Sequence, residues 1–193
     1  MSFRVEMSNA LAAAGLQHVE AVAFVSPKTV PAMAGAADVV AGLDANGPTW
    51  WALVPNRRGA EMALLAGLRH LTVTVSASPV YSQQNVGMTV AESITQVESI
   101  CSLDGEMIVD AVVSCAFGSS FDDDVTAADV ESVCSSLIDA GVEQLTLADT
   151  TGTATPRRIE SVLGRTGVER LVGWGSAGLL ASSRVSMVGA HRR

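Results

Sequence analysis

The chain has 193 residues, enough to bury one substantial hydrophobic core. Hydrophobic residues make up 48% of the sequence and charged residues 17%, a composition that excludes a disordered chain. The net charge is −8 and the basic residues form no run longer than a pair, so we expect no binding to nucleic acid.

The sequence also predicts where the protein resides. No apolar run approaches the ~20 residues that span a bilayer, and the first residues lack the apolar segment of a signal peptide, so we expect no membrane partner and a cytoplasmic location. Cys101, Cys115 and Cys134 show no Cys-x-x-Cys spacing. This pattern favours reduced thiols over a disulfide framework or a zinc site.

Helices and strands are predicted to alternate along the chain. The predicted helices cover residues 5–14, 31–43, 59–66, 89–103, 126–140 and 156–165, with 78–88 as a loop. The predicted strands cover residues 19–25, 50–54, 70–77, 107–114 and 144–148, and a sixth begins at 171–173. Thr89 with Glu92, and Thr126 with Asp129, have the spacing of capping boxes.

Three similar segments predict the joints between a helix and the strand after it. They contain Ala14-Gly15, Ala66-Gly67 and Ala140-Gly141, each followed within three residues by an apolar run. Glycine ends a helix readily because it adopts a left-handed conformation without a Cβ penalty. A repeated joint of this kind predicts β/α units with parallel strands, whose sites lie at the carboxyl ends of the strands.

The predicted fold class is therefore α/β. The chain is shorter than the roughly 250 residues of a complete eight-stranded barrel, but part of a barrel built from β/α units fits the strand pattern. An open doubly wound sheet would also fit the strand pattern. No Gly-x-Gly-x-x-Gly segment follows any predicted strand, however, which disfavours a dinucleotide-binding sheet.

Two carboxylates are candidate catalytic groups. Asp149 follows a predicted strand, where β/α barrels place catalytic residues, although it could instead cap the turn that it begins. Glu20 lies in an otherwise apolar strand, and a buried carboxylate is costly without a partner. It therefore either faces the barrel mouth or pairs with a cation.

Other polar residues carry weaker signals. Ser76, Ser78 and Asn85 could donate hydrogen bonds to a ligand, but they are also ordinary loop residues. The run Asp122–Asp124 does not fit the calcium-loop pattern and is better explained as a solvated helix entry. The histidines lack a metal-ligand spacing, so no metal ligand is assigned from the residues alone.

Several segments, in order along residues 8 to 173, resemble the hydroxymethylglutaryl-CoA lyase family. They are Phe24–Met33, Val54–Gly59, Ser76–Ser78 with Asn85, Val113–Gly118 and Leu147–Pro156. The resemblance implies a truncated (β/α)8 barrel of the TIM type, with five to six of its eight β/α units present. It also implies an enzyme that depends on a divalent metal, Mg²⁺ or Mn²⁺. It implies cleavage of the acyl-CoA substrate 3-hydroxy-3-methylglutaryl-CoA into acetyl-CoA and acetoacetate, a carbon–carbon lyase reaction of leucine degradation.

The resemblance also implies roles for individual residues. Glu20 and Asp149 match catalytic acidic positions of the family, and both are expected on the carboxyl side of the sheet. Ser76, Ser78 and Asn85 are expected to bind substrate. The resemblance leaves open a homo-oligomer.

The sequence departs from the family pattern at positions that matter for activity. An Arg-Asp-Gly-Leu-Gln segment is not found, Asp110 replaces an arginine, and Trp174–Ala177 replaces a His-x-His-Asp motif. The family's metal-ligand set is therefore incomplete, and we expect the chain alone to be inactive. We expect residues 1–173 to form the partial barrel and residues 174–193 to be a non-matching tail. The alternatives are a non-catalytic remnant whose tail is read out of frame, and a binding subunit that completes its barrel with another chain.

Overall fold

A computed structural model describes residues 3–121 and 124–167 of the chain. The strands are β1 (His18–Ala23), β2 (Thr49–Leu53), β3 (His70–Ser76), β4 (Ile108–Ser114) and β5 (Gln144–Leu147). The helices are α1 (Phe3–Ala13), the 3₁₀ helix η1 (Pro31–Met33), α2 (Ala36–Ala41), α3 (Arg57–Leu65), α4 (Pro79–Val86), α5 (Val90–Cys101), α6 (Ala127–Asp139) and α7 (Pro156–Thr166).

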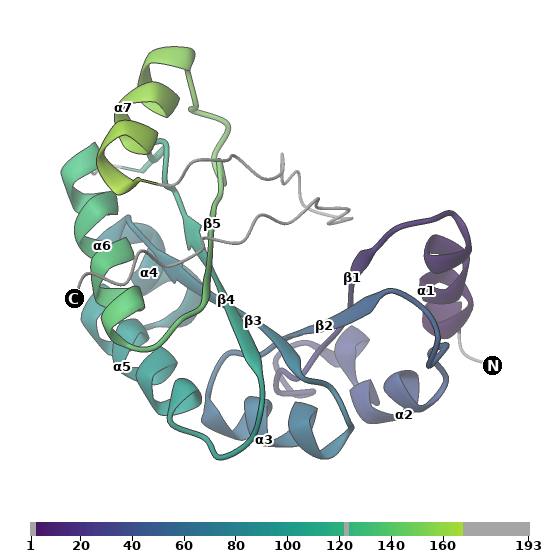
Figure 1. The fold of residues 1–193 in the computed structure, drawn as a ribbon. Coiled ribbons are helices and arrows are strands. Elements are labelled where there is room, and N and C mark those ends of the chain that lie inside the picture. Colours follow the sequence, from purple (N-terminus) through teal and green to yellow (C-terminus); the bar gives the residue numbers. More distant parts are fainter. Residues whose placement is uncertain (1–2, 122–123, 168–193) are drawn as a thin grey trace.

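The five strands form one parallel sheet in the order β1-β2-β3-β4-β5. The sheet curves into an open crescent, with the strands on its concave side and the helices around its outside (Figure 1). Strands that pair in chain order without a reversal are typical of a β/α barrel and exclude the doubly wound sheet. The prediction of parallel strands in sequence order is confirmed.

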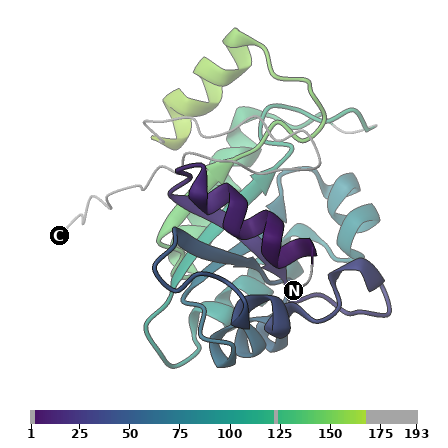
Figure 2. The ribbon, with the colours of Figure 1, turned by 90° about the vertical axis from the view of Figure 1, so that its right-hand side faces the viewer.

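The hydrophobic core lies between the convex face of the sheet and the helices. On β3, the alternate residues Leu71, Val73 and Val75 are at most 2% exposed, and they belong to one cluster with Val97 and Ile100 of α5. The corresponding residues of the other strands continue the same layer. At one end of the crescent, α1 packs against β1 and α2 and completes this layer (Figure 2).

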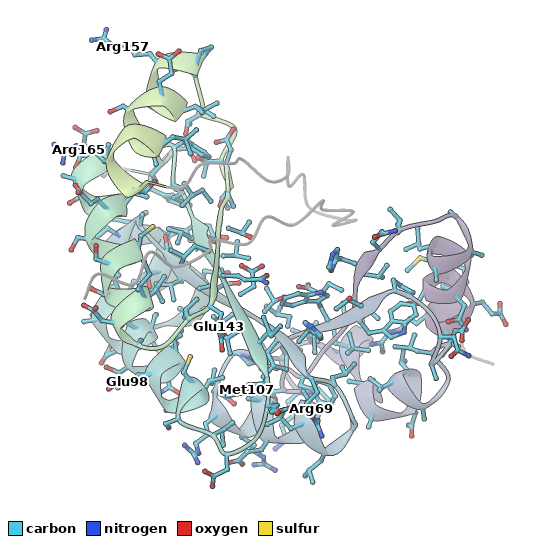
Figure 3. The ribbon with its side chains drawn as sticks, viewed as in Figure 1. Arg69, Glu98, Met107, Glu143, Arg157 and Arg165 are labelled. Atoms are coloured by element: carbon cyan, nitrogen blue, oxygen red, sulfur yellow. The ribbon has the colours of Figure 1, made fainter. Side chains whose placement is uncertain are left out.

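The concave face of the sheet is more polar than the convex face. On β3 the residues between the core positions are Thr72 and Thr74, and on β4 and β5 they include Asp110 and Thr146. Side chains of the strands project into the space that the crescent encloses (Figure 3). Polar side chains on this inner face can bind a ligand or take part in a reaction.

The three predicted helix-to-strand joints have nearly the same backbone geometry. Gly15, Gly67 and Gly141 have φ values of 91°, 95° and 96°. A residue with a Cβ is strained at these angles, so the backbone requires glycine. An added Cβ would meet nothing within 4 Å at Gly15 and Gly67, but at Gly141 it would lie 3.3 Å from Cys101 Cβ. The recurrence confirms that the chain repeats one β/α connection.

The segment 78–88, predicted to be a loop, instead contains helix α4. Ser78 caps this helix by accepting a hydrogen bond from the Tyr81 N–H at 2.9 Å, Pro79 is its first residue, and Gly87 ends it with φ of 69°. The predicted helix 31–43 is divided into η1 and the short α2. The strand expected at 171–173, Asp122 and Asp123, and the tail 174–193 lie outside the described residues.

Candidate functional site

The loop after β4 begins with a backbone conformation that is unusual for a residue with a side chain. Cys115 is fully buried and has φ of 57°, the single positive φ among non-glycine residues of the described chain. Its N–H donates to Thr150 Oγ1 at 3.0 Å, in the loop after β5. Such strained residues persist where the surrounding structure holds them, and they occur frequently at functional sites.

Further hydrogen bonds join the loops after β4 and β5 at the carboxyl edge of the sheet. The Ala116 N–H donates to the Ala148 carbonyl at 3.1 Å, and Thr151 Oγ1 donates to the Gly118 carbonyl at 3.2 Å. Arg158 of α7 donates through Nη1 to the Phe117 carbonyl at 3.3 Å. The two loops therefore form one hydrogen-bonded unit.

Asp149, a predicted catalytic residue, lies in this unit two residues beyond the end of β5. Its Oδ1 accepts hydrogen bonds from the N–H groups of Thr153 at 2.9 Å and Ala154 at 3.2 Å. The turn-capping role that the sequence left open is thus present in the structure. Within the described chain Oδ2 accepts no hydrogen bond, so one carboxylate oxygen remains for a ligand.

Glu20, the second predicted catalytic residue, lies in the middle of β1 and is half-buried. The strand register pairs it with Trp51 on β2, which in turn pairs with His70, the first residue of β3. The Trp51 ring lies 4.8 Å from the His70 ring, and its Nε1–H donates to His18 Nδ1 at 3.4 Å. By register, then, Glu20 lies beside a cluster of tryptophan and histidine rings, whereas Asp149 follows the carboxyl end of β5. The expectation that both carboxylates lie on the carboxyl side of the sheet stays a prediction.

The predicted substrate-binding residues are divided between two environments. Ser76 and Ser78 are buried, and Ser76 Oγ accepts a hydrogen bond from the Ser78 N–H at 3.0 Å. Ser78 Oγ in turn accepts the hydrogen bond from the Tyr81 N–H, so the side-chain oxygens of both serines stabilise the start of α4. Asn85 is exposed near the end of the same helix.

Tyr81 and Phe121 were not predicted as site residues. Their rings meet edge to face with centroids 5.7 Å apart. Burial, and then the neighbouring Cys115 thiol, raise the pKa of Tyr81, which keeps the phenol protonated. The recognisable sequence signal was the Ser78-Pro79 pair that starts a helix and directs Tyr81 toward the loop after β4.

A cavity of about 620 Å³ opens beside Asn85. It is lined by residues 25–30 after β1, the end of β2 with residues 54–56, the last turn of α4, and α5. A second cavity, of about 520 Å³, lies at the opposite edge, where α1 ends and β1 and β2 begin. Because β/α barrels bind ligands at the carboxyl edge, the first cavity belongs to the candidate site.

The described residues do not fit a metal ion. No group of three or more His, Cys, Asp or Glu side chains lies together among residues 3–121 and 124–167. Asp110, a buried carboxylate on the concave face, accepts a hydrogen bond from Thr146 Oγ1 at 3.1 Å. A divalent metal usually needs more oxygen ligands than this pairing offers.

A parallel sheet in barrel order, with two hydrogen-bonded loops and a cavity at its carboxyl edge, defines a segment of a β/α barrel. The HMGL-like family model matches residues 1–169, and the chain belongs to this family. It is 36% identical over 177 residues to the 3-hydroxy-3-isohexenylglutaryl-CoA/hydroxymethylglutaryl-CoA lyase of Pseudomonas aeruginosa, covering 88% of this chain and 59% of the relative.

Solved structures give the same result. Hydroxymethylglutaryl-CoA lyase from Pseudomonas aeruginosa superposes with a TM-score of 0.80 at 35% identity, covering 87% of this chain and 58% of that structure. An HMG-CoA lyase from Acinetobacter baumannii, in complex with coenzyme A and 3-methylmalate, gives a TM-score of 0.78 at 30% identity, covering 87% and 57%. The chain thus spans less than two thirds of these relatives. No helix of the described residues is long and apolar enough to cross a membrane.

Proposed function

We propose that this chain is a segment of a carbon–carbon lyase that acts on 3-hydroxy-3-methylglutaryl-CoA or a closely related CoA thioester. The observation that carries the proposal is the agreement in sequence and fold with hydroxymethylglutaryl-CoA lyases over more than four fifths of the chain. Two substrates appear in the name of the Pseudomonas aeruginosa relative, so the acyl group is the least constrained part of the proposal.

The proposed reaction begins with loss of the proton from the tertiary hydroxyl of the substrate. The bond between the carbinol carbon and the carbon next to the thioester then breaks. The electron pair of that bond forms the enolate of acetyl-CoA, and the alkoxide becomes the keto group of acetoacetate. Protonation of the enolate carbon completes the reaction, so this chemistry needs a base and an acid within hydrogen-bonding reach.

We assign the roles of base and acid in this reaction to the carboxyl groups of Glu20 and Asp149. Glu20 is supported by its position on the concave face beside aromatic and imidazole rings. Asp149 is supported by its place at the carboxyl edge and by Oδ2, while Oδ1 fixes its orientation through the Thr153 and Ala154 N–H groups. Asn85 is assigned to substrate binding, and Ser76 and Ser78 to holding the start of α4, the helix that carries Asn85.

The family resemblance implies Mg²⁺ or Mn²⁺ as a cofactor. The described residues do not form a site for either ion, so none of the proposed steps uses a metal. With this ligand set, the purified 193-residue chain is expected to cleave 3-hydroxy-3-methylglutaryl-CoA no faster than Mg²⁺ or Mn²⁺ alone. Release of acetyl-CoA and acetoacetate, measured with each ion, checks this expectation.

A version of the chain extended with the family's Arg-Asp-Gly-Leu-Gln and His-x-His-Asp segments tests the function itself. We expect it to release acetyl-CoA, and we expect Asp149→Asn to lower that rate by roughly 10²-fold or more, the scale of acid–base catalysis. Asp139→Asn, at the exposed end of α6, is the matched control and should leave the rate unchanged. An extended protein that folds but cleaves no 3-hydroxyacyl-CoA contradicts the proposal.

A further inference from the structure

The turn between α2 and β2 contains Asn46-Gly47, the single Asn-Gly pair of the sequence. Residues 44–47 are exposed, and the Asn46 side-chain amide makes no hydrogen bond within the described chain. Asn46 and Gly47 also line the 520 Å³ cavity at the amino edge of the sheet. Solvent therefore reaches both the side-chain amide of Asn46 and the backbone of the residue after it.

The packing of this turn requires glycine at position 47. A Cβ added to Gly47 would lie 2.9 Å from Trp50 Cζ2 and 3.0 Å from the Asp44 carbonyl oxygen. The same carbonyl accepts hydrogen bonds from the Gly47 N–H at 3.0 Å and from Trp50 Nε1–H at 2.9 Å. The turn thus places beside Asn46 the one residue type that has no side chain to shield its backbone nitrogen.

We propose that Asn46 is a site of covalent modification, where asparagine converts to isoaspartate without an enzyme. The backbone nitrogen of Gly47 forms a bond to Asn46 Cγ, and the bond between Cγ and the side-chain nitrogen breaks. That nitrogen leaves as ammonia and carries away the proton of the Gly47 N–H, so a five-membered succinimide ring remains. Water then opens the ring, at the main-chain carbonyl to give isoaspartate or at Cγ to give aspartate. The whole conversion consumes water and releases ammonia, with no oxidation or reduction.

The hydrogen bond from the Gly47 N–H to the Asp44 carbonyl has to open before the nitrogen can attack. Because the whole turn is exposed, water replaces this bond at a small net cost. Asp44 Oδ1 also accepts from the Asn46 N–H at 2.9 Å, a contact that the attack does not need to break.

The other three asparagines of the chain are better protected. Asn9 makes hydrogen bonds through both Nδ2 and Oδ1, each at 3.1 Å. Asn56 Oδ1 caps α3 by accepting a hydrogen bond at 3.0 Å, and an arginine follows it. Asn85 is exposed, but it lies in α4 and precedes a valine, whose branched side chain crowds the backbone nitrogen. The structure therefore selects Asn46 among the four.

The modification changes the turn in two ways. Isoaspartate adds a methylene to the main chain between α2 and β2, and its carboxylate lies two residues from Asp44 in a protein of net charge −8. The longer chain displaces the groups of Asn46, Gly47 and Trp50 that donate to Asp44. An Asn46→Asp variant gains the charge and keeps the ordinary backbone, so it separates the two effects.

The experiment incubates the purified chain at mildly alkaline pH, both folded and unfolded in urea, and measures released ammonia and the position of isoaspartate by peptide mass spectrometry. We expect isoaspartate and aspartate at position 46 of the folded chain. Asn46→Gln should lose this product and most of the ammonia, whereas the control Asn85→Gln should keep both. The exposed Asp104-Gly105 pair can form the same ring, but it releases water instead of ammonia and is thereby distinguished.

Thermal unfolding should show a lower Tm for the aged chain than for Asn46→Asp, and equal Tm values would overturn the displacement of the turn. A folded chain that keeps the Asn46 amide while the urea-unfolded chain loses it would overturn the proposal, as would the absence of conversion in both. Conversion of Asn56 or Asn85 in the folded chain as fast as that of Asn46 would overturn it as well.

Discussion

Gly118 connects backbone geometry with the packing of the carboxyl-edge loops, so its substitution gives a sharp prediction. Its φ is 119°, and a Cβ added there would lie 2.5 Å from Arg158 Nη1 and 3.0 Å from Thr153 Oγ1. Gly118→Ala therefore combines a disfavoured conformation with a collision. Gly152→Ala is the matched control, because Gly152 also has a positive φ, 71°, but an added Cβ there would meet nothing within 4 Å.

The expected cost of Gly118→Ala has two parts. A residue with a Cβ in a sparsely populated backbone region costs about 1–3 kcal/mol. The collision displaces Arg158, whose Nη1 donates to the carbonyls of Phe117 and Thr153, both at 3.3 Å. These bonds are long and the arginine is exposed, so their loss adds roughly 1 kcal/mol. The total is about 2–4 kcal/mol, against about 1–2 kcal/mol for the control.

Thermal and urea unfolding followed by circular dichroism measure this difference. At roughly 2–4 °C per kcal/mol for a chain of this size, Gly118→Ala should lower Tm by about 4–16 °C. Because Arg158→Ala removes the main collision, Gly118→Ala should cost roughly 1 kcal/mol less in that background. Equal losses of stability for Gly118→Ala and Gly152→Ala, with no coupling to Arg158, would refute the reasoning.

Two further predictions concern titratable groups. The Thr126 side chain and N–H donate hydrogen bonds to the Asp129 carboxylate, and these bonds lower the pKa of that carboxyl below its ordinary 3.8. The capping box therefore stabilises the fold fully above pH 3.8. This contribution is lost as the pH falls through the lowered pKa. Thr126→Ala should therefore cost about 0.5–2 kcal/mol at pH 7 in urea unfolding and less at pH 3, and an equal cost at both would contradict the assignment. Burial, joined at Cys101 by Glu143, raises the pKa values of Cys101 and Cys134 to about 11, so alkylation at pH 8, followed by mass spectrometry, should be slow at both until denaturant is added.

The fold could be predicted wherever a local signal decided the structure by itself. The Ala-Gly joints required a left-handed residue, and Thr89 with Glu92 formed the capping box that its spacing predicted. Helix α4 was missed although Ser78, Pro79 and Gly87 mark its start and end, because its polar sequence lacks the apolar periodicity that identifies a helix. The curvature of the sheet came from the family resemblance, since parallel strands alone fit an open sheet equally well.

The candidate site was less predictable because its interactions join residues far apart in sequence. Asp149 could be placed after a strand from its neighbours, but the hydrogen bond from Cys115 to Thr150 crosses between two loops and leaves no spacing to recognise. From the sequence, Arg158 is expected to be a surface residue in the first turn of a helix, where the macrodipole disfavours a cation. Its role becomes visible only when α7 is packed against the loop after β4.

The carboxyl edge of this chain has two parts that differ in how completely their polar groups are satisfied. Around Asp149, one hydrogen bond that Thr150 accepts and others that Thr151 and Arg158 donate tie two loops together, which suits groups that must be held in position for chemistry. Beside β1 and β2, the cavity is lined by the side-chain amides of Asn85 and Gln96, which make no hydrogen bond within the described chain. The first part can hold a reacting group in one orientation, whereas the second leaves room for a neighbouring part of a ligand.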